Sequence, residues 1–125
     1  MPTLIRVLWV VLICCVVVGS LLPGSSPAIV AIGRLHISLK LMHYCAYTLL
    51  ALVALIAVPR RSTAVQAALA MILLGVGLEF GQKLVSGRSC EIRDMLINGC
   101  GVLTGIAIGM FCRRIVSVIT GSGLS

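Results

Sequence analysis

The sequence predicts an all-α integral membrane bundle of four transmembrane helices, forming a single domain over residues 1–125. Composition is the first indication: 60% of the residues are hydrophobic and 10% are charged, whereas an average soluble domain is about 25% charged. Four apolar runs also approach the roughly 20 residues that a helix needs to cross a bilayer. Because these runs lack the alternation of lipid-facing strands, helices are expected rather than a barrel.

The first span is expected at residues 4–22, with Arg6 near its start and a stretch rich in proline and glycine, 23–27, after it. One positive charge, an apolar core and small residues behind it also fit a cleavable signal peptide. We interpret the run as a retained span because three more spans follow. The connection to Ile37 is mildly apolar, and a position along the membrane surface is one interpretation of it.

The remaining spans are separated by short polar breaks. The second is expected at residues 39–58, and a basic break at 59–62 separates it from the third, at 63–84. The fourth is expected at 94–112, and residues 121–125 are interpreted as a flexible tail.

Polar residues gather from the end of the third span to the start of the fourth, where all three acidic residues lie: Glu79, Glu91 and Asp94. Ionisable groups beside hydrocarbon are costly, and they are usually functional or paired. Since successive spans alternate in direction, the start of the second, the end of the third and the start of the fourth share one side. We therefore predict one interfacial ligand pocket, formed by Lys40, His43, Tyr47, Glu79, Gln82, Arg88, Asp94 and Asn98.

Acidic and basic side chains in this set are predicted to pair. Glu79 precedes Lys83 by four residues, which is the favourable order for a helical ion pair. Its expected role is counter-ion to Lys40, Lys83 or Arg88, with a general base or a proton-coupling group as alternatives. Lys40 and Arg88 are the best candidates for binding an anion.

The other members of the set have two interpretations each. His43 is either a neutral hydrogen-bonding residue between helices or a proton carrier, because its charge changes near neutral pH. Asp94 suits a helix cap and an ion pair. Asn98 suits a hydrogen bond between spans, and Tyr47 suits packing.

Several site classes find no support. The six cysteines form no CxxC, and no Cys/His set has zinc-ligand spacing, so neither a metal nor a cofactor is predicted. The net charge of +7 does not indicate nucleic-acid binding, since the basic residues form no continuous patch with aromatics between them. Cys90 lies in a polar loop and is expected to be an accessible thiol.

Charge also bears on orientation. Lys and Arg residues divide equally, five to each side of the predicted spans, so the positive-inside rule alone gives a tie. The clusters Arg60-Arg61 and Arg113-Arg114 contain no acid and adjoin span ends, and we interpret them as topology signals. Both termini are therefore expected in the cytoplasm.

Glycines recur at spacings of four, at Gly77 and Gly81 and at Gly101, Gly105 and Gly109. Such spacing permits close approach of helix backbones. Packing within the chain is the favoured interpretation, and a homodimer through these glycine faces is the alternative.

The order of the polar residues resembles the VanZ-like family of small multi-span bacterial membrane proteins. The residues that carry the resemblance, over roughly 37–109, are Lys40-x2-His43-x3-Tyr47, Glu79-x2-Gln82, Arg88 and Asp94-x3-Asn98-x2-Gly101-x3-Gly105. Leu39 departs from it, because the family often has an acid before the lysine. The namesake is associated with teicoplanin resistance, so the resemblance implies a bacterial protein that acts near the cell envelope.

Three functions are compatible with these residues. The first is binding of an anionic membrane lipid headgroup or a lipid-linked cell-wall precursor, in an accessory envelope or antibiotic-resistance role. The second is an intramembrane enzyme on a lipid phosphate or ester, with His43, Glu79 and Asp94 as acid–base candidates; no nucleophile or metal motif accompanies them. The third is a small proton-coupled exporter, although Glu79 lies near a span end rather than at the midplane.

Overall fold

The computed structural model describes residues 2–121, which form five helices and no strand. The helices are α1 (Pro2–Leu21), α2 (Pro27–Arg34), α3 (Leu39–Ala57), α4 (Arg61–Gln82) and α5 (Ile92–Thr120). Four of them, all except α2, are long and apolar enough to cross a membrane. The prediction of an all-α bundle with four spans is therefore confirmed.

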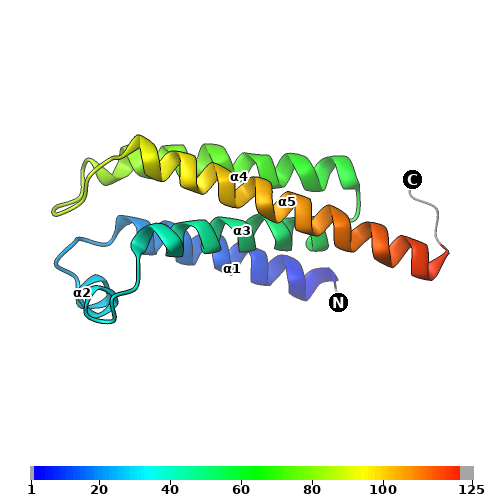
Figure 1. Cartoon of the computed structure of the whole chain (residues 1–125), viewed down its shortest axis with the longest axis horizontal. Helices are drawn as coiled ribbons and strands as arrows, with labels where there is room; N and C mark the ends of the chain where they lie inside the picture. Colours follow the sequence, from blue (N-terminus) through cyan, green and yellow to red (C-terminus); the bar gives the residue numbers. More distant parts are fainter. Residues whose placement is uncertain (1, 122–125) are drawn as a thin grey trace.

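The four long helices run side by side, and successive ones point in opposite directions (Figure 1). One end of the bundle holds α2 and the connection between α4 and α5. The other end holds the start of α1, the connection between α3 and α4, and the end of α5. Below, the first is called the α2 end and the second the α3–α4 end.

Three of the spans, α1, α3 and α4, begin and end within two residues of the predicted bounds, but α5 does not. It continues through Arg113 and Arg114 to Thr120, where Cys112 was the expected last residue. At 1.5 Å per residue its 29 residues extend about 43 Å, more than the roughly 30 Å of a hydrocarbon core. Gly121, with a left-handed φ of 64°, ends the helix. The rest of the predicted tail, 122–125, lies outside the described residues.

A short helix, α2, occupies the connection that was expected only to be mildly apolar. Proline at its first position is pre-organised for a helix and lacks the N–H that would have no partner there. Its residues are not buried among the long helices. It crosses the α2 end of the bundle between α1 and α3 (Figure 1).

The most extensive contact between helices joins α3 to α5, and glycine makes it possible. A Cβ on Gly101 would lie 2.6 Å from the carbonyl oxygen of Tyr44, and one on Gly109 would lie 2.7 Å from Cβ of Leu55. Only the absence of side chains lets the two backbones come this close. The α5 glycines are thus used for packing within the chain.

The carboxyl end of α3 is held by arginines from two other helices. Arg113 of α5 donates hydrogen bonds from Nη1 to the carbonyl oxygens of Leu55 at 2.7 Å and Val58 at 2.8 Å. Arg6 of α1 donates from Nε to the carbonyl oxygen of Ala57 at 3.4 Å. The last carbonyls of a helix have no partner within it and carry partial negative charge, so cations stabilise them. Arg113, interpreted above as a topology signal, therefore also has a structural role.

Substitution of Gly105 tests the close approach of α3 and α5. An added Cβ there would lie 2.8 Å from Cβ of Ala51, so Gly105→Ala should lower the free energy of unfolding by about 1–3 kcal/mol. The matched control is Gly99→Ala on the same helix, where a Cβ meets nothing within 4 Å. It should be neutral or stabilising by up to about 1 kcal/mol. Thermal unfolding in detergent measures both, and equal midpoints would contradict the packing described.

Removal of the Arg113 guanidinium tests the cap on α3. Arg113→Gln should lower the free energy of unfolding by about 1–3 kcal/mol, since hydrogen bonds from a charged donor are lost and carbonyls are left unpaired. Arg114→Gln, which removes an exposed guanidinium from the next position, should change it little in a neutral detergent. Thermal unfolding is again the measurement, and the cap has no stabilising role if both variants melt alike.

Candidate functional site

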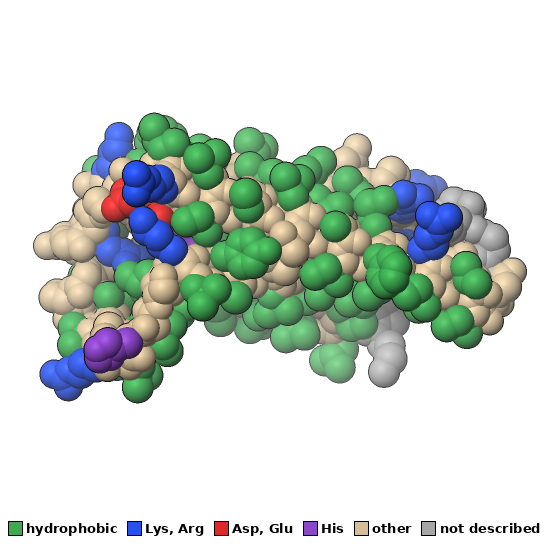
Figure 2. Space-filling view, in the orientation of Figure 1, with side chains coloured by type: hydrophobic (Ala, Val, Ile, Leu, Met, Phe, Trp, Pro, Cys, Tyr) green, Lys and Arg blue, Asp and Glu red, His purple; other side chains and the backbone are tan. Residues whose placement is uncertain are grey.

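The charged side chains gather at the two ends of the bundle, with a hydrophobic surface between them (Figure 2). The acidic groups lie at the α2 end, beside lysine and arginine side chains. This is the end at which the sequence predicted the start of α3, the end of α4 and the start of α5 to meet. The hydrogen bonds described next join these three segments.

Glu79, near the end of α4, is the central group of the cluster. Its side chain is 1% exposed, and Oε2 accepts a hydrogen bond from the backbone N–H of Glu91 at 3.3 Å. Glu91 directly precedes α5, so the Glu79 carboxylate accepts a hydrogen bond from the backbone at the start of the next span. His43, Arg88 and Asp94 all lie close enough to Glu79 to interact with it electrostatically.

His43 and Asn98 link α3 to α5. Nδ1 of His43 lies 3.3 Å from Oδ1 of Asn98, whose side chain is buried. Gly75 of α4 provides the space beside them, because a Cβ there would lie 3.2 Å from both Nδ2 of Asn98 and Cε1 of Tyr47. The structure thus gives Asn98 the hydrogen bond between spans that was predicted for it.

The lysines have different partners from those predicted. Lys40 pairs with Glu91, its Nζ lying 3.5 Å from Oε2, and both side chains are about half exposed. Lys83 follows the last residue of α4 and lies over the ring of Phe80, 5.2 Å from its centroid. The predicted pair of Glu79 with Lys40 or Lys83 is therefore not formed: Glu79 points into the bundle, whereas both lysines remain at its surface.

Arg88 joins the connection between α4 and α5 to α1. Its Nη2 donates a hydrogen bond to the carbonyl oxygen of Ser20 at 3.2 Å. The backbone N–H of Gly24 donates to the carbonyl oxygen of Ser86 at 3.1 Å, which ties the two connections together. Both contacts hold the end of α1 beside the cluster. The sequence pattern gave no signal for them, since any residue can supply a backbone group.

A groove of about 370 Å³ lies between α1, α2 and α3, and we call it the α1–α3 groove. Three of the predicted ligand-binding residues line it: His43, Tyr47 and Arg88. The rest of its wall is almost entirely apolar and includes Leu12, Val16, Gly19, Ile29, Ile32, Met42, Ala46 and Leu50. The other predicted residues, Lys40, Glu79, Gln82, Asp94 and Asn98, do not line it.

Several buried polar atoms of the cluster have no hydrogen-bond partner among the described residues. They are Oη of Tyr47, Oε1 of Glu79, Nε2 of Gln82, Nε of Arg88 and Oδ1 of Asp94. Leaving such atoms unpaired costs free energy, and five of them belong to one cluster. The cluster therefore offers donors and acceptors beyond those that its own fold uses.

Sequence reasoning did not include Glu91 in the site, although it receives contacts from Lys40, Ser89 and Glu79. Its position immediately before the fourth apolar run was the available signal. Within residues 2–121 no three His, Cys, Asp or Glu side chains come together as a metal site would need. The ionisable side chains in the wall of the groove include the guanidinium of Arg88 and the imidazole of His43.

Comparison with known proteins agrees with the residue pattern. The chain has no match among curated proteins or solved structures. The VanZ/LLP1 family profile matches residues 8–113, which include all of α2, α3 and α4 and most of α1 and α5. The resemblance drawn from the polar residues is thereby confirmed, and the chain belongs to the VanZ/LLP1 family.

Proposed function

We propose that the chain binds an anionic lipid headgroup, or the headgroup of a lipid-linked envelope precursor, at the α2 end of the bundle. The observation that carries this proposal is the α1–α3 groove, whose apolar walls lead to Arg88 and His43. A lipid has the matching shape, with an apolar chain joined to a charged head. Pockets of this kind take their specificity from a few polar groups in an apolar wall.

The charge at the head of the groove supports an anionic partner. Arg88 lines the groove, and its planar guanidinium suits phosphate oxygens. Lys40 and the exposed Arg93 add positive charge at the same end. Glu79 bonds to the backbone of α5 from inside the bundle, so it offsets the cations without lining the groove.

In a cell we place this site on the outer side of the bacterial cytoplasmic membrane, with both termini in the cytoplasm. The clusters Arg60-Arg61 and Arg113-Arg114 at the α3–α4 end, which has no acidic residue, support this orientation. A protein so placed could hold a lipid-linked wall precursor or restrict the access of an antibiotic to it. That is the accessory envelope role that the family's namesake suggests.

A second candidate function, hydrolysis of a lipid phosphate or ester, has one observation in its favour. His43 lines the groove, and its Nδ1 lies within hydrogen-bonding distance of Asn98. A histidine oriented by a second side chain is the usual arrangement of a general base. Binding remains the preferred proposal, because neither Cys15 nor Ser20, which also line the groove, has a hydrogen bond to His43 among the described contacts.

The binding proposal is tested by native mass spectrometry of protein purified from bacterial membranes in a mild detergent. Arg88→Gln should weaken retention of one anionic lipid on the order of tenfold, as expected for loss of a charge-assisted hydrogen bond. Gly19→Leu should do the same by filling the groove, since a Cβ at Gly19 meets nothing within 4 Å. Arg34→Gln removes an exposed charge of α2 outside the groove wall and is the control.

Two results would count against the proposal. One is unchanged retention in both Arg88→Gln and Gly19→Leu, and the other is equal loss in the Arg34→Gln control. A bound species with the mass of a cleaved lipid, replaced by the intact lipid in His43→Ala, would favour the enzyme instead. Thermal unfolding of each variant shows whether a loss of lipid follows from loss of the fold.

The proposed orientation makes a separate prediction about Cys90, which lies partly exposed in the connection between α4 and α5. A membrane-impermeant maleimide added to intact spheroplasts should label it to near completion. Cys90→Ser should abolish this labelling, because the other cysteines lie within the membrane-spanning helices. Labelling that requires lysis would reverse the orientation, with the site then facing the cytoplasm.

A further inference from the structure

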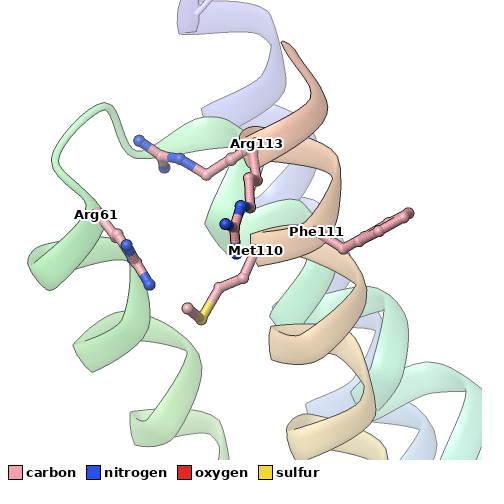
Figure 3. Close-up of a pocket in the computed structure, with 5 residues that line it drawn as sticks. Arg61, Met110, Phe111 and Arg113 are labelled. Carbon is pink, nitrogen blue, oxygen red and sulfur yellow. The ribbon is translucent and has the colours of Figure 1, made fainter. Parts of the chain in front are cut away.

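A second pocket lies at the α3–α4 end, far from the site described above. It encloses about 320 Å³ between the start of α4 and the last third of α5, and it is lined by Arg61, Met110, Phe111, Arg113 and Arg114. We call it the arginine pocket. Arg61 and Met110 extend toward each other from the two helices, and Phe111 extends outward from α5 (Figure 3).

The arginine pocket carries positive charge that no acidic side chain of residues 2–121 neutralises. Arg113 is engaged with the carboxyl end of α3, but Arg61 and Arg114 are exposed. All three acidic residues of the chain belong to the cluster at the α2 end. Arg60 lies beside Arg61 and lines an adjoining hollow, which shares Arg61 and Met110 with the pocket. A ligand here should therefore be an anion.

The depth of the arginines identifies the kind of anion. Beyond Arg114, α5 continues with exposed apolar side chains at Ile115, Val116, Val118 and Ile119. Five residues of helix extend about 7.5 Å, which is comparable to the thickness of one headgroup layer, about 5–8 Å. Apolar surface thus lies on both sides of Arg114 along α5, an arrangement that fits a guanidinium at the level of lipid phosphates better than one in bulk water.

We infer that the arginine pocket is a second lipid site, which binds the phosphate of an anionic phospholipid between Arg61 and Arg114. Planar guanidinium groups pair well with phosphate oxygens. Met110 and Phe111 supply apolar contact for the first part of an acyl chain. The lipid belongs to the leaflet at the α3–α4 end, opposite to the leaflet of the α1–α3 groove, whichever way the bundle is oriented.

The test isolates this pocket by working in the Arg88→Gln background, which removes the main charge of the other site. Purified protein is titrated with phosphatidylglycerol and, separately, with the zwitterionic phosphatidylcholine, and bound lipid is counted by native mass spectrometry. Combining Arg61→Gln with Arg114→Gln should weaken phosphatidylglycerol binding on the order of tenfold and leave phosphatidylcholine binding unchanged. The control, Arg34→Gln, removes one positive charge at the α2 end, as each of the two substitutions does at the pocket. It should change the binding of neither phosphatidylglycerol nor phosphatidylcholine.

Replacing both arginines by lysine adds a finer comparison, because it keeps the charge and removes the planar fork. The Arg61→Lys and Arg114→Lys pair should bind phosphatidylglycerol with intermediate affinity. If the double glutamine variant loses its thermal transition, the single changes Arg61→Gln and Arg114→Gln are measured, and each should weaken binding by a few fold.

Three outcomes would overturn the inference. The first is phosphatidylglycerol binding within twofold of the parent in the glutamine variants. The second is an equal loss of phosphatidylcholine, which would indicate general damage to the lipid-facing surface. The third is displacement of phosphatidylglycerol by millimolar inorganic phosphate, which would make the pocket a site for free phosphate. None of these results depends on whether Arg88 binds a lipid.

Discussion

The close approach of α3 and α5 is the constraint on which the rest of the structure depends. Within a bilayer, helices gain little from hydrophobic burial against one another, so packing of small residues and hydrogen bonds must hold them together. Gly101, Gly105 and Gly109 bring the two backbones together along much of their length. At one end this contact places Asn98 beside His43. At the other it delivers Arg113 to the last carbonyls of α3.

The polar cluster at the α2 end adjoins that contact, and burial of its polar groups costs free energy. Glu79 and Gln82 are brought from α4 to almost complete burial, and several of the cluster's atoms have no partner among the described residues. Membrane proteins retain such groups where they serve a function. The α1–α3 groove adjoins the cluster through His43, Tyr47 and Arg88, and binding of a lipid there is the use that we propose for these three groups.

The sequence was sufficient for the four-span fold and for the end of the bundle at which the polar residues gather. Four apolar runs and their alternating directions predicted that Lys40, Glu79 and Asp94 would share one end, as they do. The individual ion pairs were not predictable. Helical spacing assigned Lys83 to Glu79, but that spacing does not reveal that Glu79 points inward while Lys83 stays at the surface. The short helix α2 was also missed, since eight residues carry too little periodic pattern.

The carboxyl end of α5 was the least predictable of the span boundaries. Paired arginines at 113–114 resembled the end of a span, yet the helix continues to Thr120. In a soluble helix, or at the edge of a bilayer, a run of charge commonly coincides with the boundary. Here Arg113 turns back to the neighbouring helix, so the paired arginines mark a contact with α3 and not the end of the helix. Only the position of α3 in space distinguishes the two cases.

The cap on α3 has a consequence for biogenesis. A ribosome delivers the chain from its amino terminus, so α3 enters the membrane well before Arg113 has been synthesised. Until then, Arg6 is the only one of the two capping arginines that is present to donate a hydrogen bond to a carbonyl oxygen at the end of α3. The glycines of α5 against which α3 packs, Gly101, Gly105 and Gly109, are also synthesised after α3. The contacts of α3 with α1 and α4 can therefore form first, and its most extensive contact is added last, when α5 is released into the bilayer.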